Sequence, residues 1–305
     1  MKHLIIVNTH AGHGKETKAV AEEAFKGLNY EIYETVDQRS CISFLKNYFK
    51  DNKKELTRVY ACGGDGTLHE VVNGLVGVPN AELALYACGT GNDFAKVYGG
   101  KDKFLDFKKL IDGKVTPIDL TKLEGPSMAE PWYSINVINF GFDAIVGAKG
   151  NENKKKGIKD PYGFTHAIVP AILHGRFNKA TIYADGENLN GKKFLLGSVA
   201  QGQYVGGEWH AAPKSDNTDG LLDVCCVKTM TFLGLMTKLF GAYHDGKHVD
   251  NPKLAKKVMY RRSQEVVVKT TNDKEFNMCV DGEIVAGKEF KCSIAPKAIN
   301  FVIPE

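Results

Sequence analysis

The chain has 305 residues, of which 43% are hydrophobic and 25% are charged. This balance is typical of a globular protein and excludes a disordered, fibrous or coiled-coil chain. The 40 basic and 36 acidic residues leave a net charge of +4, which is too small for a nucleic-acid binder. The length allows two domains, each with its own hydrophobic core, and the 32 glycines exceed the usual share of about 7%.

Targeting signals and disulfide patterns are absent from the sequence. No run of about 18 apolar residues occurs, so we expect no transmembrane helix. Residues 3–7 already resemble a buried strand rather than the start of a secretory signal. The seven cysteines are odd in number and form no CxxC motif, which favours reduced, buried thiols. We therefore expect a cytoplasmic protein.

The first part of the chain alternates between strand-like and helix-like patterns. Strands are predicted at residues 3–7, 30–33, 59–62 and 83–87, and helices at 15–28, around 42–49 and after residue 67. Thr67 and Glu70 form a capping-box pattern at the start of the third helix. Repeated βα units predict a parallel sheet with helices on both faces.

The pattern changes after about residue 124. Residues 125–131 contain two prolines and read as a linker. Further strands are predicted at residues 132–142, 181–183, 194–200, 221–227, 265–270, 276–280, 290–294 and 299–303, and helices near 162–173 and 232–243. Mostly antiparallel strands predict a β-sandwich-like second domain. We expect an α/β domain at 1–124, a β-rich domain at 125–298, and a segment at 299–305 for which a return to the first domain is one option.

Three glycine-containing loops follow predicted strands of the parallel sheet. The strongest signal is Gly-Gly-Asp-Gly-Thr at residues 63–67, before a helix. Ligands bind at the carboxyl ends of parallel strands, where backbone N–H groups and a helix N-terminus favour a phosphate. Asp65 would place a carboxylate beside that phosphate, where Mg²⁺ could bridge the two. The simpler interpretation is a tight turn with a solvated aspartate.

The other two loops are weaker signals. Gly-Thr-Gly-Asn-Asp at residues 89–93 also follows a strand, and the loop at residues 8–15 lacks the spacing of a P-loop. Both could supply backbone donors to a nucleotide, or be ordinary turns.

Two acidic clusters stand in the second domain. Residues 216–223 offer closely spaced oxygen ligands that suit Mg²⁺ or Ca²⁺, although an Asp-rich turn would look the same. Asp281 and Glu283 flank a glycine after a strand, which makes them candidates for a general base or members of a hairpin turn.

Taken in order, these motifs resemble the diacylglycerol-kinase catalytic family, and within it the stand-alone bacterial lipid kinases. The most specific part is GGDGTLHEVVNGL at residues 63–75, followed by GTGNDFA at residues 89–95. The resemblance extends from residue 8 to residue 283 and includes a second-domain signature at residues 206–223. It implies a first domain similar to NAD kinase and phosphofructokinase, and an ATP-dependent transfer of phosphate to a lipid hydroxyl.

The resemblance also implies roles for individual residues. An ATP cradle would be formed by Asn8, Thr9, His10, Ala11, Gly12, Gly64, Asp65, Gly66, Thr67 and Leu68, with Thr90 and Thr35 nearby. Asp65 would act with Mg²⁺, while Asn92, Asp93 and Asp119 would line the cleft. Glu283, in the matching Asp281-Gly282-Glu283, would be the base that takes the lipid hydroxyl proton. The side chain of Asp219 and the carbonyls of Asp216 and Leu221 would bind a structural Mg²⁺. Thr9 departs from the proline usual in the family.

Several alternatives stay open from the sequence. A kinase of a soluble acceptor or a catalytically silent nucleotide-binding regulator would share these loops. The lysines at residues 154–159 and the basic stretch at residues 253–262 could contact anionic headgroups or be ordinary surface charges. The apolar stripe that includes Leu233 and Phe240 could be core or lipid-facing. The identity of the lipid and the oligomeric state, a homodimer included, are left open.

Overall fold

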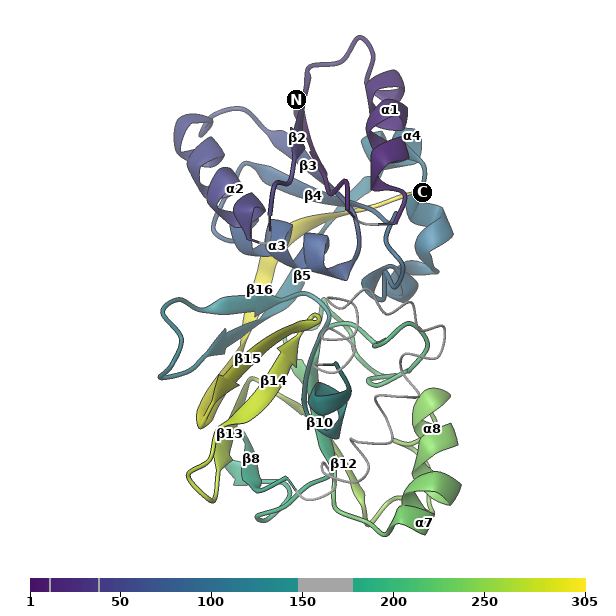
Figure 1. Cartoon of the computed structure of the whole chain (residues 1–305), viewed down its shortest axis with the longest axis vertical. Coiled ribbons are helices and arrows are strands. Elements are labelled where there is room, and N and C mark those ends of the chain that lie inside the picture. Colours follow the sequence, from purple (N-terminus) through teal and green to yellow (C-terminus); the bar gives the residue numbers. More distant parts are fainter. Residues whose placement is uncertain (11, 38, 148–177) are drawn as a thin grey trace. The chain divides into compact units, whose positions relative to one another are not determined.

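The computed structural model describes residues 1–10, 12–37, 39–147 and 178–305 (Figure 1). The chain forms two compact units. Unit 1 contains Met1–Leu120 and Pro296–Glu305, and unit 2 contains Thr121–Ala295. The helix expected near residues 162–173 and the lysines at 154–159 lie outside the described residues. Among the described residues, no helix is long and apolar enough to cross a membrane.

Unit 1 is built on a parallel sheet. Its strands are β1 (Lys2–Val7), β2 (Tyr30–Glu34), β3 (Thr57–Cys62) and β4 (Ala81–Tyr86), in the order β2-β1-β3-β4. Four consecutive residues of β1, from Leu4 to Val7, are fully buried. A strand covered on both faces needs apolar residues at every position rather than at alternate ones, which explains the continuous apolar run in the sequence.

Helices cover both faces of this sheet. In Figure 1, α1 (Gly14–Ala24) and α4 (Phe107–Ile111) lie on one side, and α2 (Ser40–Asp51) and α3 (Asp65–Leu75) lie on the other. Gly74 lets α2 and α3 approach closely, because a Cβ there would lie 2.8 Å from Cβ of Leu45. After β4 come the short 3₁₀ helices η1 (Phe94–Tyr98) and η2 (Lys101–Phe104).

The chain passes between the units twice, through β5 (Lys114–Glu124) and β16 (Glu289–Ile303). Near its end β16 joins the sheet of unit 1, where Phe301 and Val302 pair in parallel with β4. The return of the C-terminal segment, which the sequence offered as one option, is therefore how unit 1 completes its sheet.

Unit 2 consists of two layers of antiparallel strands around a common core. The first layer has the order β12-β11-β10-β7-β14-β15. Its strands are β7 (Val137–Gly141), β10 (Leu196–Ala200), β11 (Leu222–Val227), β12 (Val258–Ser263), β14 (Phe276–Val280) and β15 (Glu283–Gly287). The second layer contains β13 (Glu265–Thr270) between β16 and β8 (Ala180–Ala184), with β9 (Glu187–Asn188) beside β8 and β6 (Trp132–Ser134) paired with β5.

The core of unit 2 draws side chains from both layers. Fully buried Ile138 and Phe140 of one layer belong to the same cluster as Val266, Val268 and Phe290 of the other. A helical segment of α7 (Phe232–Gly234), the π-helical turn η3 (Leu235–Leu239) and α8 (Phe240–His244) packs on the first layer. The fold class predicted from the sequence, a parallel α/β domain with an antiparallel sandwich-like domain, is confirmed.

Candidate functional site

Three loops of unit 1 meet where the strands β1, β3 and β4 end. The N–H of Asn8 donates to the carbonyl of Cys62 at 3.0 Å, and the N–H of Gly89 donates to the carbonyl of Gly63 at 2.9 Å. The N–H of His13 donates to the carbonyl of Cys88 at 3.3 Å. These bonds join the three glycine-containing loops that the sequence singled out into one surface.

Glycine is required at the points where these loops touch. A Cβ on Gly89 would lie 2.3 Å from Cα of Gly64, and a Cβ on Gly12 would lie 2.2 Å from the carbonyl oxygen of Cys88. Gly12 also has a positive φ of 46°, which favours glycine. The excess of glycine therefore reflects, at these positions, the close packing of backbone on backbone.

Asp65 connects two of the loops. Its Oδ2 accepts a hydrogen bond from the N–H of Asn92 at 2.9 Å, and its Oδ1 accepts one from the N–H of Asp93 at 2.7 Å. The side-chain amide of Asn92 donates back to the carbonyl of Gly63 at 2.9 Å. Asn92 has a φ of 51°, a conformation that asparagine tolerates better than most residues. Asp65 thus holds the loop at residues 89–93 in place, a role that the sequence analysis missed.

The N-terminus of α3 opens onto the same surface. The helix begins at Asp65 with Gly64 as its N-cap, and no side chain of a described residue caps it. Its first-turn N–H groups and its dipole form an arrangement that favours an anion. The predicted capping box at Thr67 is wrong, because the helix begins two residues earlier and Glu70 instead accepts the N–H of Arg39.

The first loop is fixed to this helix by a side chain. Nδ2 of Asn8 donates to Oγ1 of Thr67 at 3.0 Å, and Oδ1 of Asn8 accepts the N–H of His10 at 3.0 Å. Thr9 lies between them on the same turn. Leu68 is buried beneath Thr67 in the next position of the helix. Ala11 lies outside the described residues.

The other residues expected at the nucleotide site are Thr35, Thr90, Asp93 and Asp119. The N–H of Thr35 donates to the carbonyl of Val7, so Thr35 lies at the same edge of the sheet. Thr90 is exposed on the loop at residues 89–93, and Asp93 pairs with Lys96 at 2.7 Å. Asp119 is buried and accepts the N–H of Lys297 at 2.7 Å, which joins β5 to β16.

In unit 2, Asp281, Gly282 and Glu283 form the hairpin turn between β14 and β15. Asp281 and Gly282 have φ values of 49° and 100°, as a two-residue turn with Asp-Gly requires. Glu283 is half-buried at the start of β15, opposite Val280.

Asp281 accepts four hydrogen bonds from the segment before β7. Their donors are Oγ of Ser134 at 2.6 Å and the N–H groups of Ile135, Asn136 and Val137 at 3.1, 3.1 and 3.2 Å. These bonds anchor the Asp-Gly turn to the residues around the start of β7, which gives Asp281 a positioning role.

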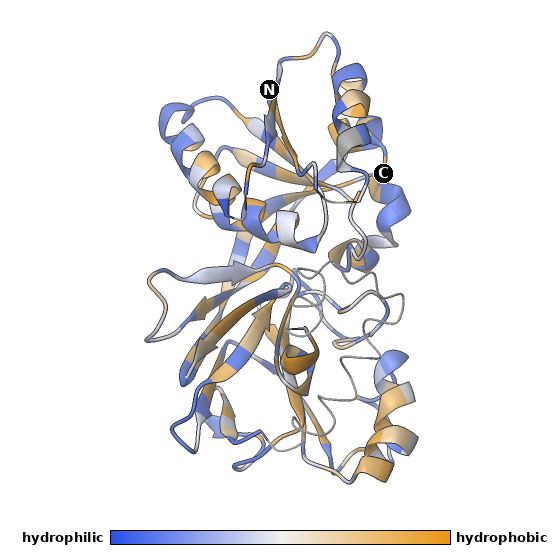
Figure 2. Ribbon diagram, viewed as in Figure 1, coloured by the Kyte–Doolittle hydropathy of each residue, from blue (hydrophilic) through white to orange (hydrophobic). Residues whose placement is uncertain are grey.

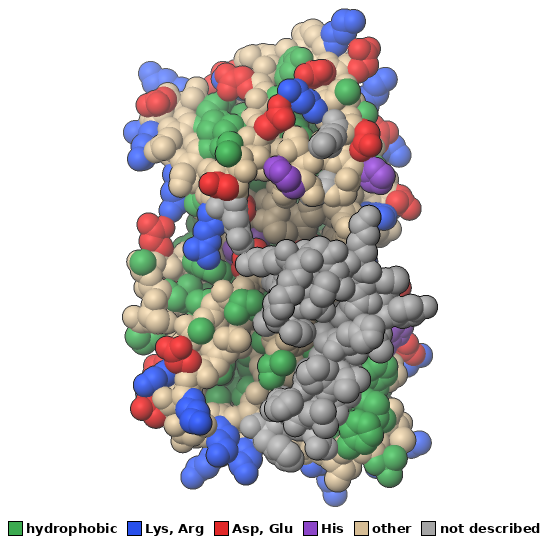
Figure 3. Space-filling view, viewed as in Figure 1, with side chains coloured by type: hydrophobic (Ala, Val, Ile, Leu, Met, Phe, Trp, Pro, Cys, Tyr) green, Lys and Arg blue, Asp and Glu red, His purple; other side chains and the backbone are tan. Residues whose placement is uncertain are grey.

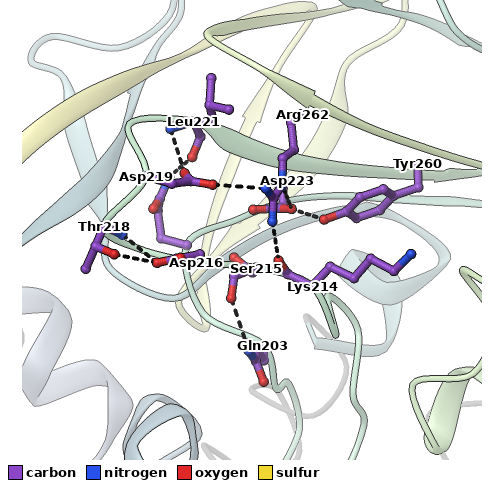
Figure 4. A network of polar contacts seen from close by, with 11 residues as sticks. Gln203, Lys214, Ser215, Asp216, Thr218, Asp219, Leu221, Asp223, Tyr260 and Arg262 are labelled. Carbon is purple, nitrogen blue, oxygen red and sulfur yellow. Dashed lines mark hydrogen bonds and ion pairs between the residues drawn. The ribbon is translucent and has the colours of Figure 1, made fainter.

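The acidic loop at residues 216–221 is closed by internal hydrogen bonds and by an arginine (Figure 4). Oδ1 of Asp216 accepts from both the N–H and the hydroxyl of Thr218, and Oδ1 of Asp219 accepts the N–H of Leu221 at 3.0 Å. The other oxygen of Asp219 lies 3.3 Å from the guanidinium of Arg262.

Arg262 also contacts Asp223 and the backbone of this region. Its Nε lies 3.4 Å from Oδ1 of Asp223, which also accepts the hydroxyl of Tyr260, and its terminal nitrogen donates to the carbonyl of Lys214 at 3.0 Å. Burial raises the pKa of Asp223 to about 6 although Arg262 opposes the shift. The sequence analysis counted Arg262 only as part of the basic stretch at residues 253–262, and no local pattern predicted its pairing with the acidic loop.

The donor set at Asp219 does not fit a structural Mg²⁺. Both of its carboxylate oxygens already face N–H donors, one of them on a cation. The described residues hold no group of three or more His, Cys, Asp or Glu placed around a common metal position. Asp65 differs in its position, because its carboxylate accepts two neutral backbone amides at the N-terminus of α3, where a phosphate would bind. A carboxylate beside a phosphate is a ligand that suits Mg²⁺.

Comparison with known proteins agrees with this geometry. The model of the diacylglycerol kinase catalytic domain matches residues 2–123, and that of the YegS C-terminal NAD kinase beta sandwich-like domain matches residues 136–303. The chain belongs to the diacylglycerol-kinase catalytic family, with a YegS-type second domain.

Relatives of this diacylglycerol-kinase-like chain match along its whole length. A protein of Pseudomonas aeruginosa (strain UCBPP-PA14) named "Probable lipid kinase YegS-like" is 29% identical over 99% of this chain and 93% of its own. A protein of the same name from Enterobacter sp. (strain 638) is 24% identical over 99% of this chain and 95% of its own.

A solved structure described as "a diacylglycerol kinases from Bacillus anthracis str. Sterne" has a TM-score of 0.69 and 22% identity, and covers 100% of this chain and 97% of that one. It shares the fold. Kinase-family membership identifies the chain as a phosphotransferase of the lipid-kinase type that uses ATP.

Proposed function

We propose that the protein transfers the γ-phosphoryl group of ATP to a hydroxyl of a membrane lipid such as diacylglycerol, with Mg²⁺ and a carboxylate base. The observation that carries the proposal is the uncapped N-terminus of α3, surrounded by loops that only glycine allows to meet. Such a site binds phosphate through backbone donors. The family and the names of the relatives support a lipid as the acceptor.

Phosphoryl transfer depends mainly on the positioning of the two reactants and on neutralisation of the phosphate charge. The lipid hydroxyl oxygen attacks the γ-phosphorus, the bond from that phosphorus to the β,γ-bridging oxygen breaks, and ADP leaves. Glu283 takes the hydroxyl proton in this proposal. Mg²⁺ would neutralise phosphate charge beside Asp65, which holds the loop at residues 89–93 with its two amide contacts. The reaction would take place in the cytoplasm, at the membrane that contains the lipid.

Labelled ATP tests the proposal against a panel of lipids in mixed micelles with Mg²⁺. We expect one lipid class to become labelled. Glu283→Gln should lower kcat by about 10²- to 10⁴-fold, the usual contribution of a general base, with little change in ATP affinity. Glu275→Gln is the matched control, because Glu275 is an exposed glutamate of the same unit.

Two outcomes would contradict the proposal. Label on a water-soluble acceptor in the absence of lipid would identify a kinase of the NAD-kinase type. ATP binding without transfer to any member of the panel would identify a nucleotide-binding regulator.

A further inference from the structure

The helical segment from Phe232 to His244 has two apolar faces. Leu235, Leu239 and Tyr243 form the inner face and are buried against unit 2. On the outer face Phe232 is 48% exposed, Leu233 71% and Phe240 36%. Figure 2 shows the ribbon at α7 coloured mainly as hydrophobic, and Figure 3 shows hydrophobic side chains gathered on the surface where Figure 1 places α7 and α8.

Aromatic side chains extend this outer face. The ring of Phe240 lies edge-on to Trp209 at a centroid distance of 4.8 Å, and Trp209 is half-buried in the loop before β11. Trp209 is also edge-on to His244 at 5.3 Å. Exposed Phe and Leu beside a Trp are the residues that insert into the boundary between lipid headgroups and acyl chains.

The same part of the chain carries the positive charge of the protein. Residues 228–257 contain six lysines and two aspartates, so their net charge of +4 equals that of the whole chain and the remaining residues sum to zero. The turn at residues 253–257 lies next to the helical segment, because Nζ of Lys257 donates to the carbonyl of Thr229 at 2.9 Å and Leu254 belongs to the cluster beneath the helix.

One of the two aspartates pairs within this stretch and the other pairs outside it. Asp245 pairs with Lys247 and contacts His244, whereas Asp250 pairs with Lys214, which lies outside the stretch. A second copy of this face would meet it with like charge, whereas an anionic bilayer offers both an apolar interior and the opposite charge.

We propose that the outer face of the helical segment, with its flanking lysines, docks the protein onto an anionic lipid bilayer. The occupant is the bilayer surface, and Leu233, Phe232 and Phe240 are the inserted side chains. The inference rests on the proposed lipid-kinase function for its purpose, but the contact itself requires neither ATP nor turnover.

Co-sedimentation with vesicles tests the docking face without measuring activity. We expect the protein to bind vesicles of phosphatidylcholine with 30 mol% phosphatidylglycerol and to bind pure phosphatidylcholine weakly. Leu233→Asp should lower partitioning into the anionic vesicles by about tenfold or more, since one buried leucine contributes that much. Val36→Asp is the matched control, because Val36 is 77% exposed and lies in unit 1.

Two charge-reversal variants distinguish the effect of a lysine on the docking face from the effect of net charge. Lys238→Glu and Lys54→Glu change the net charge equally at exposed positions, but only Lys238 lies on the helical segment. Lys238→Glu should lower binding to the anionic vesicles several-fold and Lys54→Glu should not.

Three results would overturn the inference: no binding of the wild type to anionic vesicles, equal losses in each variant and its control, or a dimer that Leu233→Asp dissociates without changing vesicle binding. If the wild-type protein bound anionic vesicles but phosphorylated no lipid, that result would contradict the proposed function and leave the docking face intact.

Discussion

At the scale of the residue, Gly89 and Gly64 face each other across two loops, but their missing side chains point in different directions. A Cβ on Gly89 would lie 2.3 Å from Cα of Gly64, whereas a Cβ on Gly64 would lie 3.6 Å from Cα of Gly89. The first distance forces the backbone to move and the second is an ordinary contact.

We expect Gly89→Ala to destabilise the protein by about 1–3 kcal/mol through overpacking and to lower kcat/KM by about a hundredfold through misplacement of the phosphate site. Gly64→Ala should lower both by less, because its Cβ would meet Cα of Gly89 at an ordinary contact distance. Urea unfolding and steady-state kinetics would measure the two effects. Equal losses in the two variants would show that the loops need glycine for flexibility rather than for close contact.

A second residue couples stability to pH. His248 is fully buried, and burial lowers its pKa from 6.5 to about 4. Between about pH 4 and pH 6.5, His248 is protonated in the unfolded chain but neutral in the folded chain. The free energy of unfolding therefore falls as the pH drops below 6.5.

Between pH 8 and pH 5 this histidine should account for a loss of about 2 kcal/mol in the free energy of unfolding. Urea titrations at the two pH values would measure it, and His248→Gln should remove most of the difference. A wild type and variant with the same pH dependence would contradict this role.

At the scale of the element, an arginine side chain from another strand holds the acidic loop before β11. Arg262 on β12 faces both Asp219 and Asp223. Arg261, its neighbour, pairs with Glu187 instead, so the two arginines provide a matched pair.

Arg262→Ala should lower the free energy of unfolding by about 1–3 kcal/mol, because it leaves the buried Asp223 without its cation, and Mg²⁺ should restore part of the loss. Neither chelator nor Mg²⁺ should change the stability of the wild type, and Arg261→Ala should have little effect. Destabilisation of the wild type by chelator would show that the loop binds a metal after all.

The strands β1, β3 and β4 were predictable because each contains an apolar run and ends at a glycine-containing loop. The start of α3 was not, since Thr67 and Glu70 match a capping box whose side chains have other partners, Asn8 and Arg39. The saturation of Asp281 and the position of Arg262 depend on strands distant in sequence, β7 and β12. Local spacing identified the acidic residues but could not show that Asp281 anchors a turn or that Asp219 and Asp223 form ion pairs.

At the scale of the whole molecule, each unit has its own hydrophobic core, and β16 contributes to both. Phe290 near its start is buried in the core of unit 2. Phe301 near its end is fully buried in unit 1, 5.2 Å from the ring of Phe94. The two tryptophans, Trp132 and Trp209, belong to unit 2, so tryptophan fluorescence reports on that unit.

We expect Phe290→Leu to shift the unfolding transition seen by tryptophan fluorescence, at a cost of roughly 1–2 kcal/mol. Phe301→Leu should shift the transition seen by far-ultraviolet circular dichroism and leave the fluorescence transition nearly in place. Identical shifts of both probes in both variants would show instead that the chain unfolds as one cooperative unit.

The pairing of β16 with β4 has a consequence for biosynthesis. Phe301 and Val302 leave the ribosome long after β1 to β4, yet they pair with β4 in the same sheet. Until these two residues emerge, β4 is an open sheet edge, which can pair with other nascent chains. A chain truncated before Phe301 would therefore be damaged in the first unit, and a fragment that stops at Leu120 would lack this strand.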